Sequence, residues 1–177
     1  VLRSEDREIM LDNVNISDQI FKTKEKMRLF SEKIISGSHK GFNGDKIDTV
    51  VNIGIGGSDL GPSMVTESLT HYKNHIKTHY VSNIDGDHIY NVLNKIKPDK
   101  TLFVIVSKTF TTIETLTNAA TVRDWFLDYA KEQDIANHFV AVSSNMKKAV
   151  DFGIKSENIF PMWDWVGGRF SLWSTVG

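Results

Sequence analysis

The stretch that decides the fold is LFVIVSKTFTTIET, which runs from Leu102 to Thr115. Its first five residues, Leu102–Val106, are all apolar, and so short an apolar run is typical of a strand buried on both faces of a sheet. A polar loop, Ser107–Thr112, follows, and helical periodicity begins at Ile113. The stretch therefore predicts a strand, a hydroxyl-rich loop and a helix N-terminus, in that order.

The loop after this strand has the chemistry of an anion site. Free N–H groups and the helix dipole favour negative charge at a helix N-terminus. Four hydroxyls and one ammonium add donors that suit phosphate oxygens, and they belong to Ser107, Lys108, Thr109, Thr111 and Thr112. The alternative is that the hydroxyls only cap the helix, since Thr111 and Glu114 have the spacing of a capping box. We favour the anion site because the donors are so crowded.

The composition is that of an ordinary globular domain. The chain has 177 residues, of which 40% are hydrophobic and 24% charged, with a formal net charge of −1. This balance gives no electrostatic reason to expect nucleic acid or an anionic membrane as partner. The sequence contains no cysteine, so disulfides and thiolate metal sites are excluded. No run is apolar enough to span a membrane, the charged N-terminus is not a signal peptide, and we expect a cytoplasmic protein.

Strands alternate with helices from residue 47 onward. This order predicts an α/β fold, a three-layer α/β/α sandwich on a parallel sheet of about five strands. In such sheets ligands bind beyond the carboxyl ends of the strands, so the loops after the first and third strands should line one cleft. The predicted strands are 47–53, 78–82, 102–106, 138–142 and 158–160, and the predicted helices are 61–72, 87–96, 113–131 and 146–152.

Residues 1–44 are expected to form a helical segment packed on the core, and residues 45–177 the anion-binding domain. Apolar residues fall at helical spacing from Ser17 to Gly37. Ser17 or Asp18 can cap the start of this helix, and Gly37 suits its end. We assign no element to residues 1–15.

A glycine-rich turn, Asn52–Pro62, follows the first predicted strand. Asp59 occupies a position where the dinucleotide fingerprint needs glycine, and Pro62 replaces the lysine of a phosphate loop. Glycines still permit close approach of a ligand, so Gly57 and Ser58 are candidate substrate contacts. The purely structural interpretation is a tight turn in which Ser58 or Asp59 caps the next helix, and we expect this turn whether or not a ligand binds.

Two other polar stretches are better explained by structure than by metal. His71 and His75 stand four residues apart, but no further ligand follows at a convincing spacing. The stretch 82–88 lacks the pattern of a calcium loop, and Asp85 or Asp87 is better read as a helix cap.

The last stretch, Trp163–Gly177, is apolar and aromatic, whereas chain ends are usually polar. We therefore expect the sequence to be a fragment that stops at the start of a buried helix. Arg169 follows two glycines there and must pair with a carboxylate or face an anion. The local pattern slightly favours the structural pairing.

Together these stretches closely resemble the glucose-6-phosphate isomerase (phosphoglucose isomerase) family. The matching segments are NIGIGGSDLGP (Asn52–Pro62), VSNIDGDH (Val81–His88), SKTFTTIET (Ser107–Thr115) and WDWVGGRFSLW (Trp163–Trp173). They occur in the family's order, and the resemblance covers about residues 47–177. It implies a sugar-isomerase (SIS) fold, in agreement with the alternation of strands and helices.

The resemblance also implies a function. The family interconverts glucose 6-phosphate and fructose 6-phosphate through an enediol, in glycolysis and gluconeogenesis, without metal or organic cofactor. By resemblance, the loop Ser107–Thr112, including Phe110 and Thr111, binds the sugar phosphate. Ser107, Thr109 and Thr112 then supply hydroxyls, and Lys108 supplies mainly its backbone N–H. Gly57 and Ser58 lie at the substrate, and Arg169 resembles the arginine that stabilises the enediolate.

The sequence departs from the family in its length. The family's base glutamate, ring-opening histidine and a further lysine follow the WDWVGGR motif, and this sequence stops before them. We therefore expect the 177 residues to bind sugar phosphate without converting it, and the full-length parent to be a homodimer. Two alternatives remain: a non-catalytic sugar-phosphate-binding SIS module and, more remotely, a nucleotide-dependent oxidoreductase.

Overall fold

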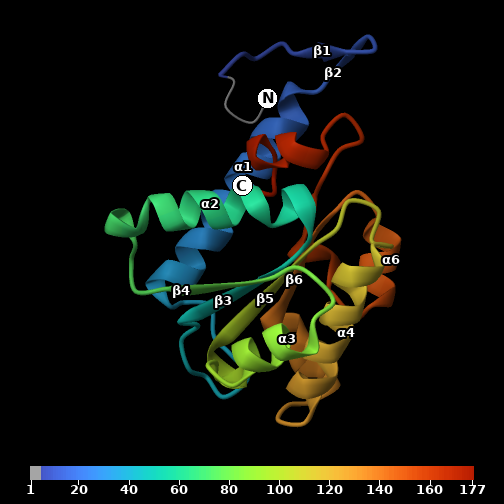
Figure 1. Ribbon diagram of the computed structural model, residues 1–177. Helices are drawn as coiled ribbons and strands as arrows, with labels where there is room; N and C mark the ends of the chain where they lie inside the picture. The colour runs from blue at the N-terminus through green and yellow to red at the C-terminus, as the bar shows by residue number, and fades with distance from the viewer. Residues whose placement is uncertain (1–4) are drawn as a thin grey trace.

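The computed structural model describes residues 5–177. Residues 1–4, which belong to the stretch 1–15 to which we assigned no element, lie outside the described part. A parallel five-stranded sheet with the order β4-β3-β5-β6-β7 forms the centre of the molecule (Figure 1). Its strands are β3 (Thr49–Ile53), β4 (Lys77–Val81), β5 (Thr101–Val106), β6 (Phe139–Ser143) and β7 (Ile159–Pro161). The predicted α/β class and the parallel sheet of about five strands are confirmed.

The helices cover both faces of this sheet. They are α1 (Ser17–Ser36), α2 (Leu60–Ser68), α3 (Gly86–Leu93), α4 (Ile113–Leu127), α5 (Ile135–His138) and α6 (Met146–Asp151). The connection through α2 moves one way along the sheet, and those through α3, α4 and α6 move the other way. Because such crossovers are right-handed, α2 lies on the opposite face from these three. In Figure 1, α2 lies above the sheet and α3 and α4 lie below it.

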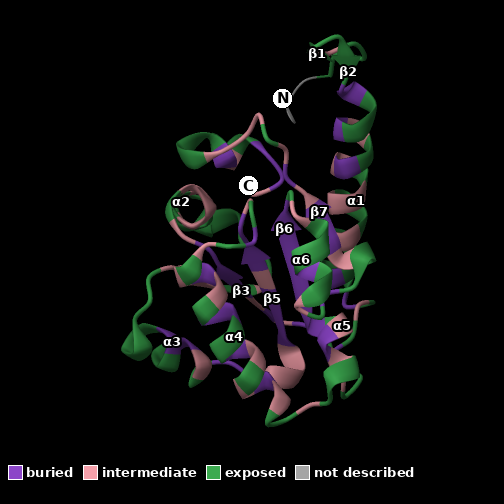
Figure 2. Ribbon diagram, turned by 90° about the vertical axis from the view of Figure 1, so that its right-hand side faces the viewer, coloured by how far each residue is buried: buried purple, intermediate pink, exposed green. Residues whose placement is uncertain are grey.

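Each face of the sheet has its own apolar cluster. The lower cluster centres on Phe103, Phe126 and Phe139, which have no exposed surface. Figure 2 shows that buried residues run along β5 and β6 at the centre of the molecule. The upper cluster joins Ile34 of α1 to residues of β5 and β6. Val104 at the centre of β5 is only partly buried, on the upper side. The upper face is therefore less completely covered than the lower face.

The two ends of α1 test the capping predictions. Gly37 has a φ of 72° and its N–H donates to the Ile34 carbonyl, so the predicted C-terminal stop is confirmed. Ile16, and neither Ser17 nor Asp18, occupies the N-cap position. The Ser17 hydroxyl instead donates to the Arg7 carbonyl at 2.7 Å, which joins α1 to the preceding segment.

That segment contains a small hairpin which the sequence analysis did not assign. Its strands are β1 (Met10–Leu11) and β2 (Val14–Asn15), which pair antiparallel. Asp12 and Asn13 between them have φ values of 48° and 63°. This is the conformation of a two-residue hairpin turn, and Asp and Asn tolerate it better than most residues.

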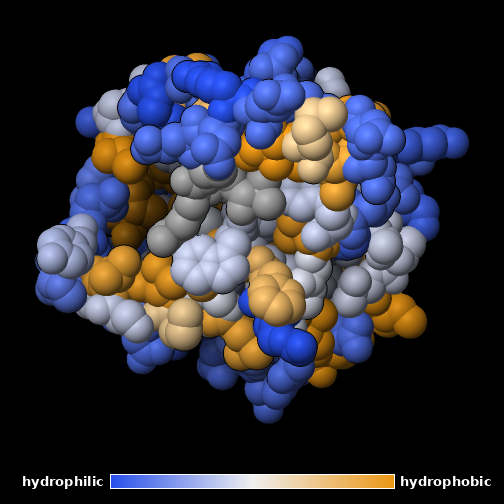
Figure 3. All heavy atoms as spheres, turned by 90° about the horizontal axis from the view of Figure 1, so that it is seen from above, coloured by the Kyte–Doolittle hydropathy of each residue, from blue (hydrophilic) through white to orange (hydrophobic). Residues whose placement is uncertain are grey.

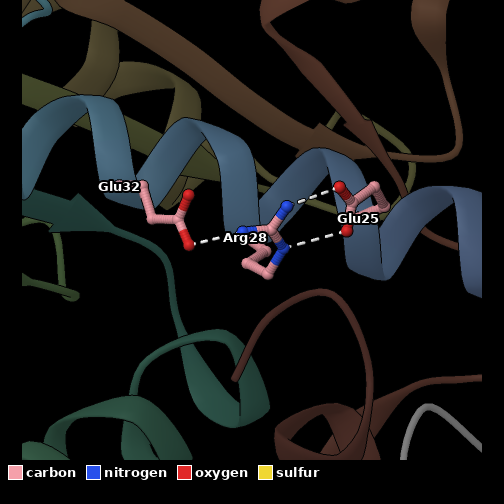
Figure 4. A network of polar contacts seen from close by, with 3 residues as sticks. All are labelled: Glu25, Arg28 and Glu32. Atoms are coloured by element: carbon pink, nitrogen blue, oxygen red, sulfur yellow. Dashed lines mark hydrogen bonds and ion pairs between the residues drawn. The ribbon is translucent and has the colours of Figure 1, made fainter.

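The outward side of α1 carries a chain of exposed ion pairs (Figure 4). The Arg28 guanidinium donates to both carboxylate oxygens of Glu25, at 2.6 and 2.9 Å, and to Glu32 at 2.5 Å. All three side chains are more than half exposed, so the network adds little stability. It identifies the solvent-facing side of the helix.

Several predicted boundaries shift by up to four residues. The helix predicted for residues 113–131 ends at Leu127, and a one-turn helix, α5, precedes β6. Asp85 caps α3 through hydrogen bonds from the Asp87 and His88 N–H groups, as predicted. Among the helices of residues 5–177, none has the length and apolar character needed to cross a membrane.

Candidate functional site

The predicted site residues gather at the carboxyl edge of the sheet. The glycine turn follows β3, the hydroxyl-rich loop Ser107–Thr112 follows β5, and Ser143 ends β6. β3 and β6 flank β5 on its two sides. A further segment, residues 163–173, returns to the same edge and contacts both loops. Three stretches that are distant in sequence therefore meet here.

Some side chains of the hydroxyl-rich loop are buried and anchor it to the core, and others are exposed to solvent. Ser107 and Phe110 are 3% and 2% exposed, whereas Thr109 and Thr111 are exposed. Phe110 has a φ of 52° and packs edge-on against Phe152 with ring centroids 5.9 Å apart. Only the backbone of Phe110 is therefore placed to contact a ligand.

The loop hydroxyls pair with one another. Ser107 Oγ donates to Thr112 Oγ1 at 3.2 Å, and the Oγ1 atoms of Thr109 and Thr111 are 2.6 Å apart. A bound anion would accept from these hydroxyls in place of their mutual bonds. The sequence predicted this grouping of four hydroxyls, and the structure brings them together in two pairs.

The start of α4 differs from the prediction. Thr112, not Thr111, is the N-cap residue, and no side chain caps the helix. The predicted capping box of Thr111 and Glu114 is therefore wrong. Within the described residues, the N–H groups of Ile113 and Glu114 have no acceptor. The first turn of α4 thus keeps free donors and its positive dipole end directed at the loop.

Lys108 has two distinct roles in this loop. Its carbonyl accepts hydrogen bonds from the hydroxyls of Ser143 and Ser144, at 2.9 and 2.7 Å, and from the Ser144 N–H. Its ammonium donates to the Asp164 carbonyl at 2.7 Å. The side chain therefore ties the loop to the tryptophan-rich segment.

Ser143 and Ser144 are site-supporting residues that the sequence analysis missed. The neighbouring Asn145 side chain also donates to the Thr109 carbonyl, at 3.2 Å. The sequence contains a signal for them, because Ser-Ser-Asn follows a predicted strand at the edge where ligands bind. These three residues fix the loop from the β6 side.

The glycine turn makes a close backbone contact that only glycine permits. A Cβ atom on Gly57 would lie 1.8 Å from the Gly168 carbonyl oxygen. The Asn52 side chain donates to the Ser58 carbonyl at 3.0 Å and holds the turn in shape. Asp59 occupies the N-cap of α2, but neither it nor Ser58 caps the helix through its side chain. The predicted side-chain cap is wrong.

Arg169 is free of carboxylates in the described part of the chain. Its guanidinium lies 5.4 Å from the Phe170 ring centroid, and the residue is exposed. The structural ion pair that the local pattern slightly favoured is therefore wrong. Gly168, which contacts Gly57, immediately precedes Arg169, so the glycine turn sets the position of this cation.

Asp59 is the titratable residue of the glycine turn. Burial raises the pKa of its carboxyl group, and the nearby His88 opposes that rise. No three metal-ligating side chains come together anywhere in residues 5–177. His71 lies against the ring of Tyr72, with centroids 4.2 Å apart.

Comparison with known proteins decides the family. The family model described as phosphoglucose isomerase matches residues 1–177. This chain belongs to the phosphoglucose isomerase family. The glucose-6-phosphate isomerase of Christiangramia forsetii is 57% identical over 174 residues, which is 98% of this chain and 32% of that protein. The enzyme of Buchnera aphidicola is 56% identical over 97% of this chain and 31% of its own length.

Solved structures agree with the assignment to the phosphoglucose isomerase family. The glucose-6-phosphate isomerase of Chlamydia trachomatis superposes with a TM-score of 0.78 at 32% identity, covering 98% of this chain and 31% of that one. A hypothetical protein from Thermus thermophilus superposes with a TM-score of 0.72 at 27% identity, covering 90% of this chain and 36% of that one. The chain thus spans about a third of the length of these relatives, and the SIS-type fold is confirmed.

Proposed function

We propose that this chain is the phosphate-binding part of a glucose-6-phosphate isomerase. The observation that carries the proposal is the uncapped N-terminus of α4 beside the paired hydroxyls of Ser107–Thr112. A sugar phosphate brings two negative charges, which the free N–H groups and the helix dipole stabilise. Ser107, Thr109 and Thr112 donate through hydroxyls, and Lys108, Phe110 and Thr111 contribute backbone.

The sugar then extends from the loop towards the glycine turn and Arg169. Gly57 and Ser58 contact the sugar, and the Arg169 guanidinium stabilises negative charge on the enediolate. Support for this role comes from the exposure of Arg169, its lack of a carboxylate partner within residues 5–177 and its place beside Gly168. Binding the remote phosphate orients the reacting carbons and so lowers the barrier to proton transfer.

The reaction is the interconversion of glucose 6-phosphate and fructose 6-phosphate without metal or organic cofactor. A carboxylate base moves one proton between C2 and C1, and a histidine opens the ring. By family resemblance both groups, and a further lysine, lie beyond the segment matched here. The 177 residues alone therefore bind substrate and do not turn it over, and the full-length protein is a homodimer in the cytoplasm.

The test of phosphate binding is a double substitution, Ser107→Ala with Thr112→Ala. Losing these charge-assisted hydrogen bonds should weaken fructose 6-phosphate binding by roughly 1–3 kcal/mol, measured by calorimetric titration. Thr117→Ala with Thr121→Ala on exposed positions of α4 is the matched control and should leave the affinity unchanged. Unchanged affinity in the first variant would place the phosphate elsewhere, and binding of NAD instead of sugar phosphate would overturn the proposal.

A further inference from the structure

One side chain joins the hydroxyl-rich loop to the segment that carries Arg169. Lys108 Nζ donates to the Asp164 carbonyl oxygen at 2.7 Å, and the two residues lie 56 positions apart in the sequence. In the described part of the chain, no other hydrogen bond links the loop Ser107–Thr112 to residues 163–170. The Lys108 ammonium also forms no ion pair with any carboxylate that the structure describes. Its hydrogen-bond partner is therefore a backbone carbonyl of a distant segment.

Lys108 is held firmly at its backbone end. Its carbonyl oxygen accepts from the hydroxyls of Ser143 and Ser144, at 2.9 and 2.7 Å, and from the Ser144 N–H at 2.9 Å. At the other end of the side chain, the ammonium lies beside Gly167, because a Cβ atom built there would be 3.8 Å from Nζ. The side chain thus connects a fixed point of the loop with the backbone two residues before Arg169.

The position of Arg169 depends on contacts of this kind. Two consecutive glycines precede it, and Gly168 has a φ of 54°, so the local backbone has many conformations open to it. The segment has two other anchors. The Trp163 indole Nε1 donates to Gln19 Oε1 of α1 at 2.8 Å, and the Gly168 carbonyl packs against Gly57. Neither of these anchors involves the hydroxyl-rich loop.

The hydrogen bond made by Lys108 lies near solvent. Figure 1 shows residues 163–170, in orange-red to red, towards the top of the molecule. Figure 3 looks onto that end, where strongly hydrophilic and strongly hydrophobic side chains lie side by side. Asp164 and Arg169 are both exposed. Because water competes for such a bond, its loss should have a modest effect.

We propose that Lys108 is a positioning residue, whose ammonium holds the segment that carries Arg169 against the hydroxyl-rich loop. The proposal rests on the proposed function, because it adds a second role for a residue of the phosphate site. The backbone of Lys108 serves the anion, and its side chain serves the placement of the Arg169 guanidinium. The loop that binds the remote phosphate thereby also orients the cation that acts on the enediolate.

The first test is Lys108→Met in the full-length protein, which keeps the backbone N–H and removes the ammonium. We expect kcat for fructose 6-phosphate to fall about 10-fold and KM to stay within about twofold, because the substrate keeps its own contacts. Lys147→Met, at an exposed position of α6, is the matched control and should change neither value. A raised KM with unchanged kcat would mean that the ammonium binds the phosphate itself, and equal losses in both variants would reflect lost charge alone. Either result overturns the proposal.

The second test asks whether Lys108 acts through Arg169. In an Arg169→Ala background, with enzyme concentration raised to keep the residual rate measurable, Lys108→Met should lower kcat by less than about twofold, because no guanidinium remains to be placed. A further 10-fold loss in that background overturns the proposal. The unsubstituted protein separates the two claims: if it does not isomerise fructose 6-phosphate, the proposed function fails. If it does and Lys108→Met keeps kcat within about twofold, only the role of Lys108 is refuted.

Discussion

The contact between Gly57 and Gly168 makes the site sensitive to a single methyl group. A Cβ atom at residue 57 would meet the Gly168 carbonyl oxygen at 1.8 Å, and real Cβ contacts below 3.0 Å essentially do not occur. In Gly57→Ala, the segment that carries Arg169 must therefore retreat by at least about 1.2 Å, the difference between these distances. Misplacing a catalytic group by about 1 Å can cost on the order of 100-fold in rate.

The assay is isomerase activity of the full-length protein. We expect kcat/KM for fructose 6-phosphate to fall about 100-fold in Gly57→Ala, mostly through kcat, because the role proposed for Arg169 is to stabilise charge that develops in the transition state. Gly86→Ala is the matched control, since a Cβ atom there meets nothing within 4 Å, and its activity should not change. If Gly57→Ala keeps its activity within about twofold, the contact does not position Arg169 and the reasoning is wrong.

Three further predictions concern the loop and the core. In Lys108→Met the hydrogen bond to the Asp164 carbonyl is lost, so the fluorescence emission of the stacked Trp163 and Trp165 should change. Lys147→Met, at an exposed position, is the control and should leave the emission unchanged. Identical spectra for Lys108→Met and the unmodified chain would mean that the Lys108 side chain does not hold the tryptophan segment. Thr115 Oγ1 is buried without a hydrogen-bond partner in the described residues. Thr115→Val should therefore raise the free energy of unfolding, measured by urea denaturation, by about 1 kcal/mol. A lower free energy of unfolding would mean that the Thr115 hydroxyl makes a hydrogen bond in solution. Burial lowers the pKa of His138 below its ordinary value of 6.5, although the hydrogen bond from the ring Nδ1–H to the Thr101 carbonyl opposes this shift. The unfolded chain then takes up the proton first, so this contribution to stability is present above pH 6.5 and falls as the pH drops below it. His138→Gln should flatten that part of the pH profile of unfolding, and an unchanged profile would mean that another group causes it.

Much of the fold could be predicted because its signals are local. A few neighbouring residues are enough to predict the strand β5 from its apolar run, the end of α1 from its glycine and the start of α3 from its capping aspartate. The hairpin at residues 10–15 carried a local signal as well, the Asp-Asn turn, which the sequence analysis did not use. One-turn elements such as α5 leave too short a pattern to detect.

The site was harder to predict because its decisive contacts join distant segments. The spacing of Thr111 and Glu114 predicted a capping box, but in the folded loop the Thr111 hydroxyl forms a hydrogen bond with the Thr109 hydroxyl. The ammonium of Lys108 was counted among the anion donors, whereas the structure directs it to the carbonyl of a residue 56 positions away. Whether Arg169 has a carboxylate partner likewise depends on the tertiary fold. The hydroxyl-rich loop itself could be identified because it is one continuous stretch.

The central claim is that a sugar phosphate binds at the N-terminus of α4. The most direct measurement is an NMR titration of the amide N–H resonances with fructose 6-phosphate. The account predicts that the largest shifts fall on residues 107–114, with a smaller set at Gly57 and Ser58. Shifts confined to residues outside these two loops, or none at saturating ligand, would contradict it.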